Sequence, residues 1–197
     1  MLTDLRLTEV ITRQTVQDYL LNLSGPTAEW PTNEQFRHRW LTTRAYVGMT
    51  KPRIRMILEA VEWQQYTKFQ ESVRPPLDEA TIEHILPQTP TDEEWPLEVT
   101  SDADEAEREQ AHLLRGDRMH SFGNLTLVTS PFNSWLSNSA FHIKEKELSS
   151  QSTLMLNRYF TQYNVKEWNM ESIKLRGDRL FEIADDIWAR PQVGQEV

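Results

Sequence analysis

The segment at residues 81–86, Thr-Ile-Glu-His-Ile-Leu, restricts the possible folds of this chain more than any other stretch. Pro75 and Pro76 precede it and Pro87 follows it, so a helix of ordinary length does not fit between them. The segment is short and partly β-branched, which favours a strand. In residues 125–128 leucines alternate with Thr and Val, and this alternation predicts a second short strand.

Helical patterns flank the two predicted strands. Apolar residues recur at spacings of three and four through much of residues 7–73 and again through residues 156–188. The sequence Thr-Asn-Glu-Gln at residues 32–35 has the form of a capping box, and a helix is predicted from Pro131, directly after the second strand. These patterns indicate an α+β protein, mostly α, in which a small strand–strand–helix core is wrapped by N- and C-terminal helices.

The length of 197 residues fits one domain of ordinary size. We expect a single domain over residues 1–197 with three parts. These parts are an N-terminal helical part at residues 1–76, a core at residues 77–150 and a C-terminal helical part at residues 151–197. The core includes a long acidic insertion at residues 88–118, in which residues 104–114 have a helical pattern.

Composition excludes several classes of protein and site. The sequence has no cysteine, which excludes disulfides, thiolate zinc sites and cysteine nucleophiles and suits a reducing cytosol. No stretch approaches the roughly 20 apolar residues of a membrane span, and no secretory leader is recognisable, so we expect a cytoplasmic protein without a membrane partner. The net charge of −9 argues against nucleic-acid binding by bulk electrostatics, but Lys and Arg cluster at residues 37–55 and 144–146 and leave room for a local polyanion site.

Four polar residues around the predicted strands point to chemistry. Glu83 and Asn133 carry a carboxylate and an amide oxygen, which are hard ligands that suit Mg²⁺ or Mn²⁺. The imidazole of His84, with an ordinary pKa of roughly 6.5, can take a proton from water near neutral pH. Asn124 begins the second strand, where its amide can hold the loop that carries His84. Adjacent residues of a regular strand point to opposite sides of the sheet, so Glu83 and His84 do not both face one phosphate from such a strand. A strand end that twists or bulges would let them face one phosphate from two directions.

Each of these residues also has an ordinary structural explanation. His84 fits a hydrogen-bonded core histidine, and Glu83 fits a solvated acid at a strand end. Asn133 fits a helix cap, and Asn124, after Gly123, fits turn chemistry. The residue types by themselves leave both explanations open.

Three blocks of sequence, in order, resemble a known family. The blocks "EHILP", "GNLTL" and Asn133, nine positions after Asn124, resemble the HNH (ββα-metal, His-Me finger) nucleases. "IEHILPQT" and "GNLTLVTSPFNSWLSNSAF", followed by Lys144, resemble more closely the C-terminal nuclease domain of GmrSD-type modification-dependent restriction enzymes. The implied fold is a ββα-metal core. This sequence has Glu83 where an aspartate is common in HNH sites.

The resemblance implies a metal-dependent DNA endonuclease with a defined set of roles. His84 would be the general base, and Asn124 would orient the loop that carries it. Glu83 and Asn133 would hold the divalent metal, Mg²⁺ or Mn²⁺.

Contacts to DNA are expected on the helix that follows the core motif. Lys144 matches a lysine of the family and is expected to contact a DNA phosphate. His142 and Lys146 lie beside it in the sequence and are expected as further DNA contacts.

The resemblance also implies a biological setting. One site in a chain implies nicking, and double-strand cleavage would then need two chains or two events. Related full-length proteins carry an N-terminal nucleotide-hydrolysing domain with a D-G-Q-Q-R motif that is absent here. We therefore expect the effector part of a prokaryotic anti-phage restriction system, partnered by such a sensor domain or subunit. The alternative is a non-catalytic DNA-binding or regulatory module that retains the ββα shape.

Overall fold

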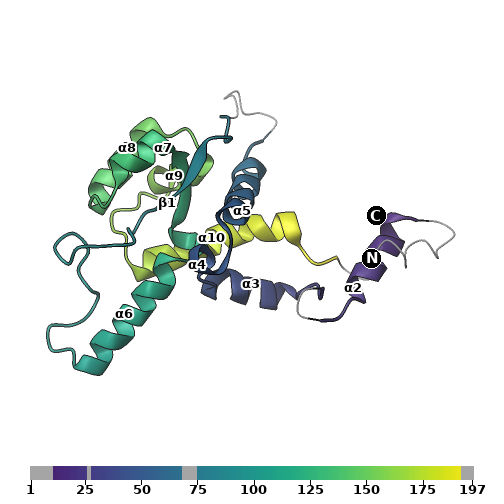
Figure 1. The fold of residues 1–197 in the computed structure, drawn as a ribbon, viewed down its shortest axis with the longest axis horizontal. Helices are drawn as coiled ribbons and strands as arrows, with labels where there is room; N and C mark the ends of the chain where they lie inside the picture. Colours follow the sequence, from purple (N-terminus) through teal and green to yellow (C-terminus); the bar gives the residue numbers. More distant parts are fainter. Residues whose placement is uncertain (1–10, 26–27, 68–74, 192–197) are drawn as a thin grey trace.

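The computed structural model describes residues 11–25, 28–67 and 75–191 (Figure 1). Its fold belongs to the expected α+β class and is mostly α, with a small two-stranded sheet among helices. In chain order the elements are α2 (Arg13–Leu21), α3 (Asn33–Thr42), α4 (Ala45–Gly48), α5 (Lys51–Gln64), β1 (Ala80–His84), α6 (Glu105–Met119), the 3-10 turn η1 (Phe122–Asn124), β2 (Leu125–Thr129), α7 (Ser130–Leu136), α8 (Phe141–Gln151), α9 (Met155–Gln162) and α10 (Met170–Trp188). In the described part of the chain, no helix combines the length and apolar content that crossing a bilayer needs.

The strands β1 and β2 form an antiparallel pair whose register runs from Ala80 opposite Thr129 to His84 opposite Leu125. The helix α7 begins at the residue after β2 ends. The predicted order of strand, insertion, strand and helix is therefore confirmed. In Figure 1 the sheet lies between α5 on one side and α7 and α8 on the other.

The sheet separates two hydrophobic cores, which explains why β2 is buried on both faces. Leu125 and Leu127 belong to a core built with α3, α5 and α10. Val128 belongs to a second core that includes Leu136 of α7 and Leu148 of α8. The alternation in β2 therefore distinguishes two buried faces, and neither of them is a solvent face.

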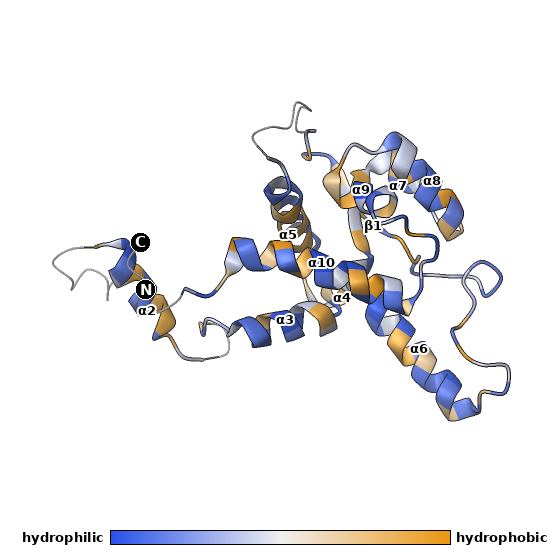
Figure 2. Cartoon of the chain, turned by 180° about the vertical axis from the view of Figure 1, so that it is seen from behind, coloured by the Kyte–Doolittle hydropathy of each residue, from blue (hydrophilic) through white to orange (hydrophobic). Residues whose placement is uncertain are grey.

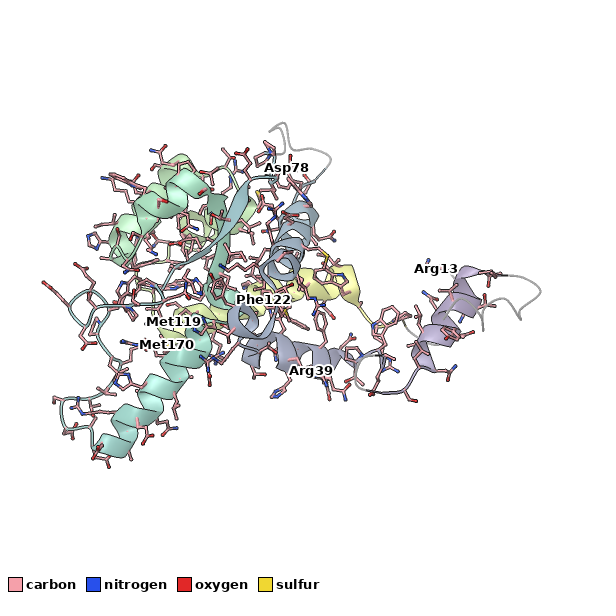
Figure 3. The ribbon with its side chains drawn as sticks, viewed as in Figure 1. Arg13, Arg39, Asp78, Met119, Phe122 and Met170 are labelled. Carbon is pink, nitrogen blue, oxygen red and sulfur yellow. The ribbon has the colours of Figure 1, made fainter. Side chains whose placement is uncertain are left out.

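A central junction positions the start of β2. The ring of Phe122 (Figure 3) stacks on Trp40 with 4.3 Å between ring centroids. The fully buried guanidinium of Arg176 donates to the carbonyl oxygens of Gly123 and Leu125, each at 2.8 Å. Three elements that are distant in sequence, α3, η1 and α10, therefore fix where residue 124 lies.

The helical elements follow the sequence patterns with some differences. The predicted capping box is present at Thr32 and Gln35. The helix in the insertion is longer than expected and extends away from the body of the molecule (Figures 1 and 2), with hydrophilic residues over much of its length. The expected helix after β2 is split into α7 and α8 by Ser137, whose φ of 42° lies in the left-handed region.

Some helical expectations differ from the structure or fall outside it. Trp135, in the helix predicted from Pro131, is 68% exposed although its side chain is large and apolar. Leu7, Val10 and Phe69, expected in helices, lie outside the described residues.

Candidate active site

The side chain of His84 occupies the last position of β1 and is only 4% exposed. Its ring packs against Tyr46 at 4.3 Å and His120 at 5.6 Å between centroids. Its Nε2 atom is buried and has no hydrogen-bond partner among the described residues. Burial is the main cause that lowers the pKa of His84 to about 3, and the nearby charge of His120 adds to it. The imidazole is therefore neutral near neutral pH, which is the form that accepts a proton.

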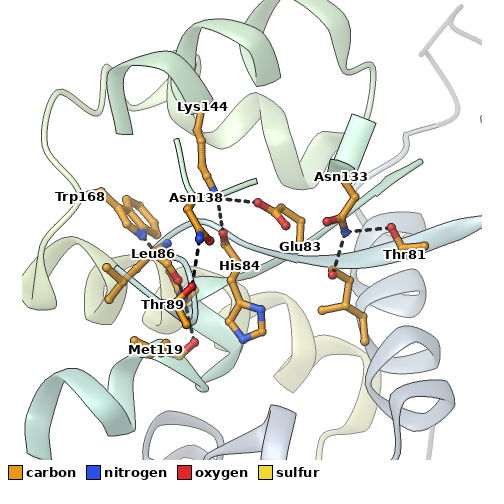
Figure 4. Close-up of polar contacts among 12 residues, drawn as sticks. Thr81, Glu83, His84, Leu86, Thr89, Met119, Asn133, Asn138, Lys144 and Trp168 are labelled. Carbon is orange, nitrogen blue, oxygen red and sulfur yellow. Dashed lines mark hydrogen bonds and ion pairs between the residues drawn. The ribbon is translucent and has the colours of Figure 1, made fainter. Parts of the chain in front are cut away.

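Glu83 projects from the opposite side of β1, where it meets α8 (Figure 4). Its Oε1 atom forms an ion pair with Lys144 Nζ at 2.6 Å, and the same ammonium donates to the backbone oxygen of His84 at 2.7 Å. Burial raises the pKa of the Glu83 carboxyl, while the positive charge of Lys144 acts to lower it. The ion pair uses Oε1, so the second carboxylate oxygen takes no part in it.

Asn133 extends from α7 toward the same side of β1 as Glu83 (Figure 4). Its Nδ2 atom donates to Thr81 Oγ1 and to the backbone oxygen of Ile82, each at 3.0 Å. These two bonds fix the orientation of the amide and leave its oxygen for another partner. Because the donors at hand are a carboxylate and an amide oxygen, the pair suits a hard cation that keeps most of its water.

A groove of about 1050 Å³ connects these residues, since Glu83, His84 and Asn133 all line it. The described residues contain no cluster of three or more His, Asp or Glu side chains arranged to hold a metal ion. A cation in this groove would therefore depend on few protein ligands and on water. The volume of the groove is large enough to hold water molecules and a phosphate group together.

The N-terminal helices also contribute side chains to this groove. Lys51 and Arg55 of α5 line it, together with Tyr46 of α4. The Arg55 guanidinium pairs with Glu59 at 2.7 Å, and the Lys51 ammonium lies 5.7 Å from the centre of the Tyr46 ring. Sequence reasoning noted Lys51 and Arg55 only within a cluster of basic residues, and it missed Tyr46 altogether because no local pattern marks that residue.

Asn124 is fully buried and uses its whole amide. Its Nδ2 atom donates to the backbone oxygens of Leu86 and Met119, and its Oδ1 atom accepts from Leu86 N and Trp168 Nε1, all within 2.9 Å. The amide therefore holds the chain two residues after His84. The bond from Trp168 was not foreseen, because tryptophans at helical spacing predict only core packing.

None of the three expected DNA contacts on α8 lines the groove of His84. Lys144 has no exposed surface, and its ammonium is paired with Glu83. His142 is exposed, but it lines a separate groove with Trp95 and Lys166. Lys146 is exposed and does not line the groove of His84.

Comparison with known families decides the relationship of this chain. A family model described as "GmrSD restriction endonucleases, C-terminal domain" matches residues 30–183. The chain belongs to this GmrSD C-terminal domain family. A comparison with curated proteins gave no match, and neither did a comparison with solved structures. The match to the GmrSD family confirms the resemblance found in the sequence, and it spans the groove residues from Tyr46 to Asn138.

Proposed function

We propose that this chain is the nuclease domain of a restriction enzyme and hydrolyses phosphodiester bonds of DNA in the groove beside β1. Membership of a family of restriction endonucleases supports a nuclease. The observation that carries the proposal is that Glu83, His84 and Asn133, from three positions of the HNH-like motif, line one groove. An acid, an imidazole and an amide that line one groove provide the groups that phosphodiester hydrolysis requires.

His84 acts as the general base in this proposal. Its imidazole is neutral near neutral pH because burial opposes the charged form, and this neutral form is the one that can accept a proton from a water in the groove. The lowered pKa weakens the base in the free protein, and the negative charge of a bound phosphate would raise that pKa. Asn124 keeps that imidazole in position by holding both polar backbone groups of Leu86. Tyr46 restricts the ring from the side, at 4.3 Å between centroids.

Glu83 and Asn133 provide oxygen donors for Mg²⁺ or Mn²⁺. When bound there, the cation would supply Lewis-acid stabilisation of the charge that grows on the phosphate and on the leaving 3′ oxygen. The protein's own part is to hold the two side chains in place, Asn133 through its bonds to β1 and Glu83 through Lys144.

DNA is the substrate in this proposal, and Lys51 and Arg55 are its phosphate contacts. Both line the groove of Glu83 and His84, whereas the residues expected as contacts on α8 do not. One such site in a chain would nick one strand, with double-strand cleavage requiring two chains or two events.

We propose further that residues 1–197 act as one nuclease domain of HNH type. It would be the effector of a prokaryotic, modification-dependent anti-phage system and would act on DNA in the cytoplasm. A nucleotide-hydrolysing sensor domain or subunit would supply the trigger. The family description supports the restriction setting.

Plasmid cleavage tests the proposal. Supercoiled plasmid incubated with Mg²⁺ or Mn²⁺ and the wild-type protein is expected to become open circular, and a chelator should stop the reaction. His84→Ala should reduce nicking about 100-fold or more, the usual contribution of a general base. His112→Ala, which removes an exposed histidine from α6, is the matched control and should cleave like the wild type.

Two outcomes would contradict the proposal. Equal cleavage by wild type and His84→Ala would remove His84 from the chemistry. Plasmid that is bound but not cut with any divalent cation would favour the alternative, a non-catalytic DNA-binding or regulatory module that retains the ββα shape.

A further inference from the structure

A lysine is an unusual side chain to find without any exposed surface, because its ammonium is strongly hydrated. Lys144 is in this position on α8, with 0% exposure. Its Nζ atom contacts the Glu83 carboxylate at 2.6 Å and the His84 carbonyl at 2.7 Å. One ammonium therefore binds two consecutive residues whose side chains point to opposite sides of β1 (Figure 4).

We propose that Lys144 is a positioning residue for the metal site, one that orients the Glu83 carboxylate so that its second oxygen faces the groove. This inference rests on the proposed function, in which Glu83 is a metal ligand. The contact with Oε1 restricts rotation of the carboxylate, and the contact with the His84 carbonyl holds the backbone from which both side chains extend. Groups that orient metal ligands in this way commonly affect metal affinity 10–100-fold.

A purely electrostatic role for Lys144 predicts the opposite result. If the ammonium only neutralised Glu83, its removal would leave a more negative site and would strengthen cation binding. If the ammonium orients Glu83, its removal lets the carboxylate rotate and weakens cation binding. The sign of the change in cation affinity therefore separates the two roles. A loss of folding stability in the variant would not separate them.

The test measures Mn²⁺ binding to the protein without DNA, by calorimetry or by the loss of the free-Mn²⁺ EPR signal. Lys144→Met should bind Mn²⁺ about tenfold or more weakly than the wild type. Lys146→Met, which removes an exposed lysine from the same helix, is the matched control and should bind like the wild type. Unchanged or tighter binding by Lys144→Met would overturn the proposal.

The Glu83→Ala variant distinguishes a failure of this inference from a failure of the proposed function. If Glu83→Ala binds Mn²⁺ as well as the wild type, or if the wild type does not bind it, Glu83 is not a ligand and both ideas fall. If Glu83→Ala loses binding and Lys144→Met keeps it, only the positioning role falls.

A second measurement does not depend on the folding of a variant. In a crystal structure of the wild-type protein soaked with Mn²⁺, anomalous scattering would locate the ion. The proposal expects the ion beside Oε2 of Glu83 with Lys144 still bonded to Oε1. A Lys144 ammonium displaced from Glu83 in that structure would overturn it.

Discussion

At the scale of single residues, burial changes the role that an amino acid has in this protein. Lys144 is a structural cation with no exposed surface, while Lys51 faces an open groove. Burial of the His84 ring, which packs against Tyr46, lowers its pKa. Asn124 is the clearest case, because four hydrogen bonds converge on one buried amide. The Asn124 amide therefore holds the backbone after His84 in place, in addition to lying near the candidate active site.

Replacing that amide should cost considerable stability. Asn124→Ala leaves four buried partners unsatisfied and is expected to lower the free energy of unfolding by about 3 kcal/mol or more. Asn124→Asp keeps the two accepted bonds but places a carboxylate oxygen against the buried carbonyl oxygens of Leu86 and Met119, so it should be at least as destabilising. Urea denaturation measures both variants. A loss below about 1 kcal/mol for Asn124→Ala would contradict the idea that this amide anchors the His84 loop.

At the scale of elements, the approach of α10 to η1 determines where β2 begins. A Cβ atom on Gly123 would lie 2.1 Å from the backbone oxygen of Ile173, which no side chain can tolerate. Gly177 lies on the facing surface of α10, and a Cβ there would lie 3.7 Å from the Cα of Gly123. The glycine of the "GNLTL" motif is therefore needed for close packing and not only for a turn.

Two glycine substitutions test this packing. Gly123→Ala must push α10 away from η1 and is expected to lower the free energy of unfolding by about 3 kcal/mol. Gly116→Ala, within α6, meets no atom within 4 Å and should raise it by up to about 1 kcal/mol, because alanine favours a helix. Thermal unfolding compares the two variants. A Gly123→Ala protein as stable as Gly116→Ala would mean that the contact is looser than described.

At the scale of the whole molecule, the charge distribution limits how DNA can approach. The chain carries a net charge of −9, so its surface as a whole repels a polyanion. Lys51 provides a local exception in the groove, while the charge of Arg55 is paired with Glu59. DNA binding should therefore be weak in general and concentrated near Lys51.

Salt dependence of binding tests this arrangement. Lys51→Met should weaken DNA binding and reduce the slope of log K against log salt by about one, because one phosphate contact is lost. Lys146→Met should leave both quantities unchanged, since that lysine lies outside the groove. Fluorescence anisotropy at several salt concentrations measures both. A larger effect from Lys146 would restore α8 as the DNA-binding surface and remove α5 from that role.

Local sequence was enough to determine the elements of the core and the choice of candidate residues. Prolines and β-branched residues predicted β1, alternation predicted β2, and the capping box predicted the start of α3. Each of these signals acts over a few residues, through backbone sterics or side-chain hydrogen bonds to the nearby backbone. The motif blocks indicated Glu83, His84 and Asn133 as candidate site residues.

Only the tertiary structure decided what these residues face. Glu83 and Lys144 are 61 positions apart, and their ion pair depends on how α8 packs on the sheet. Glu62 of α5 similarly accepts hydrogen bonds from Met155 N and Leu156 N and so caps α9, which no local pattern reveals. Burial and electrostatic pairing arise from contacts between distant segments, whereas propensity and periodicity report only on neighbours along the chain. The sequence could therefore name the acid, the imidazole and the lysine, but which of them faces solvent and which is paired followed from packing alone.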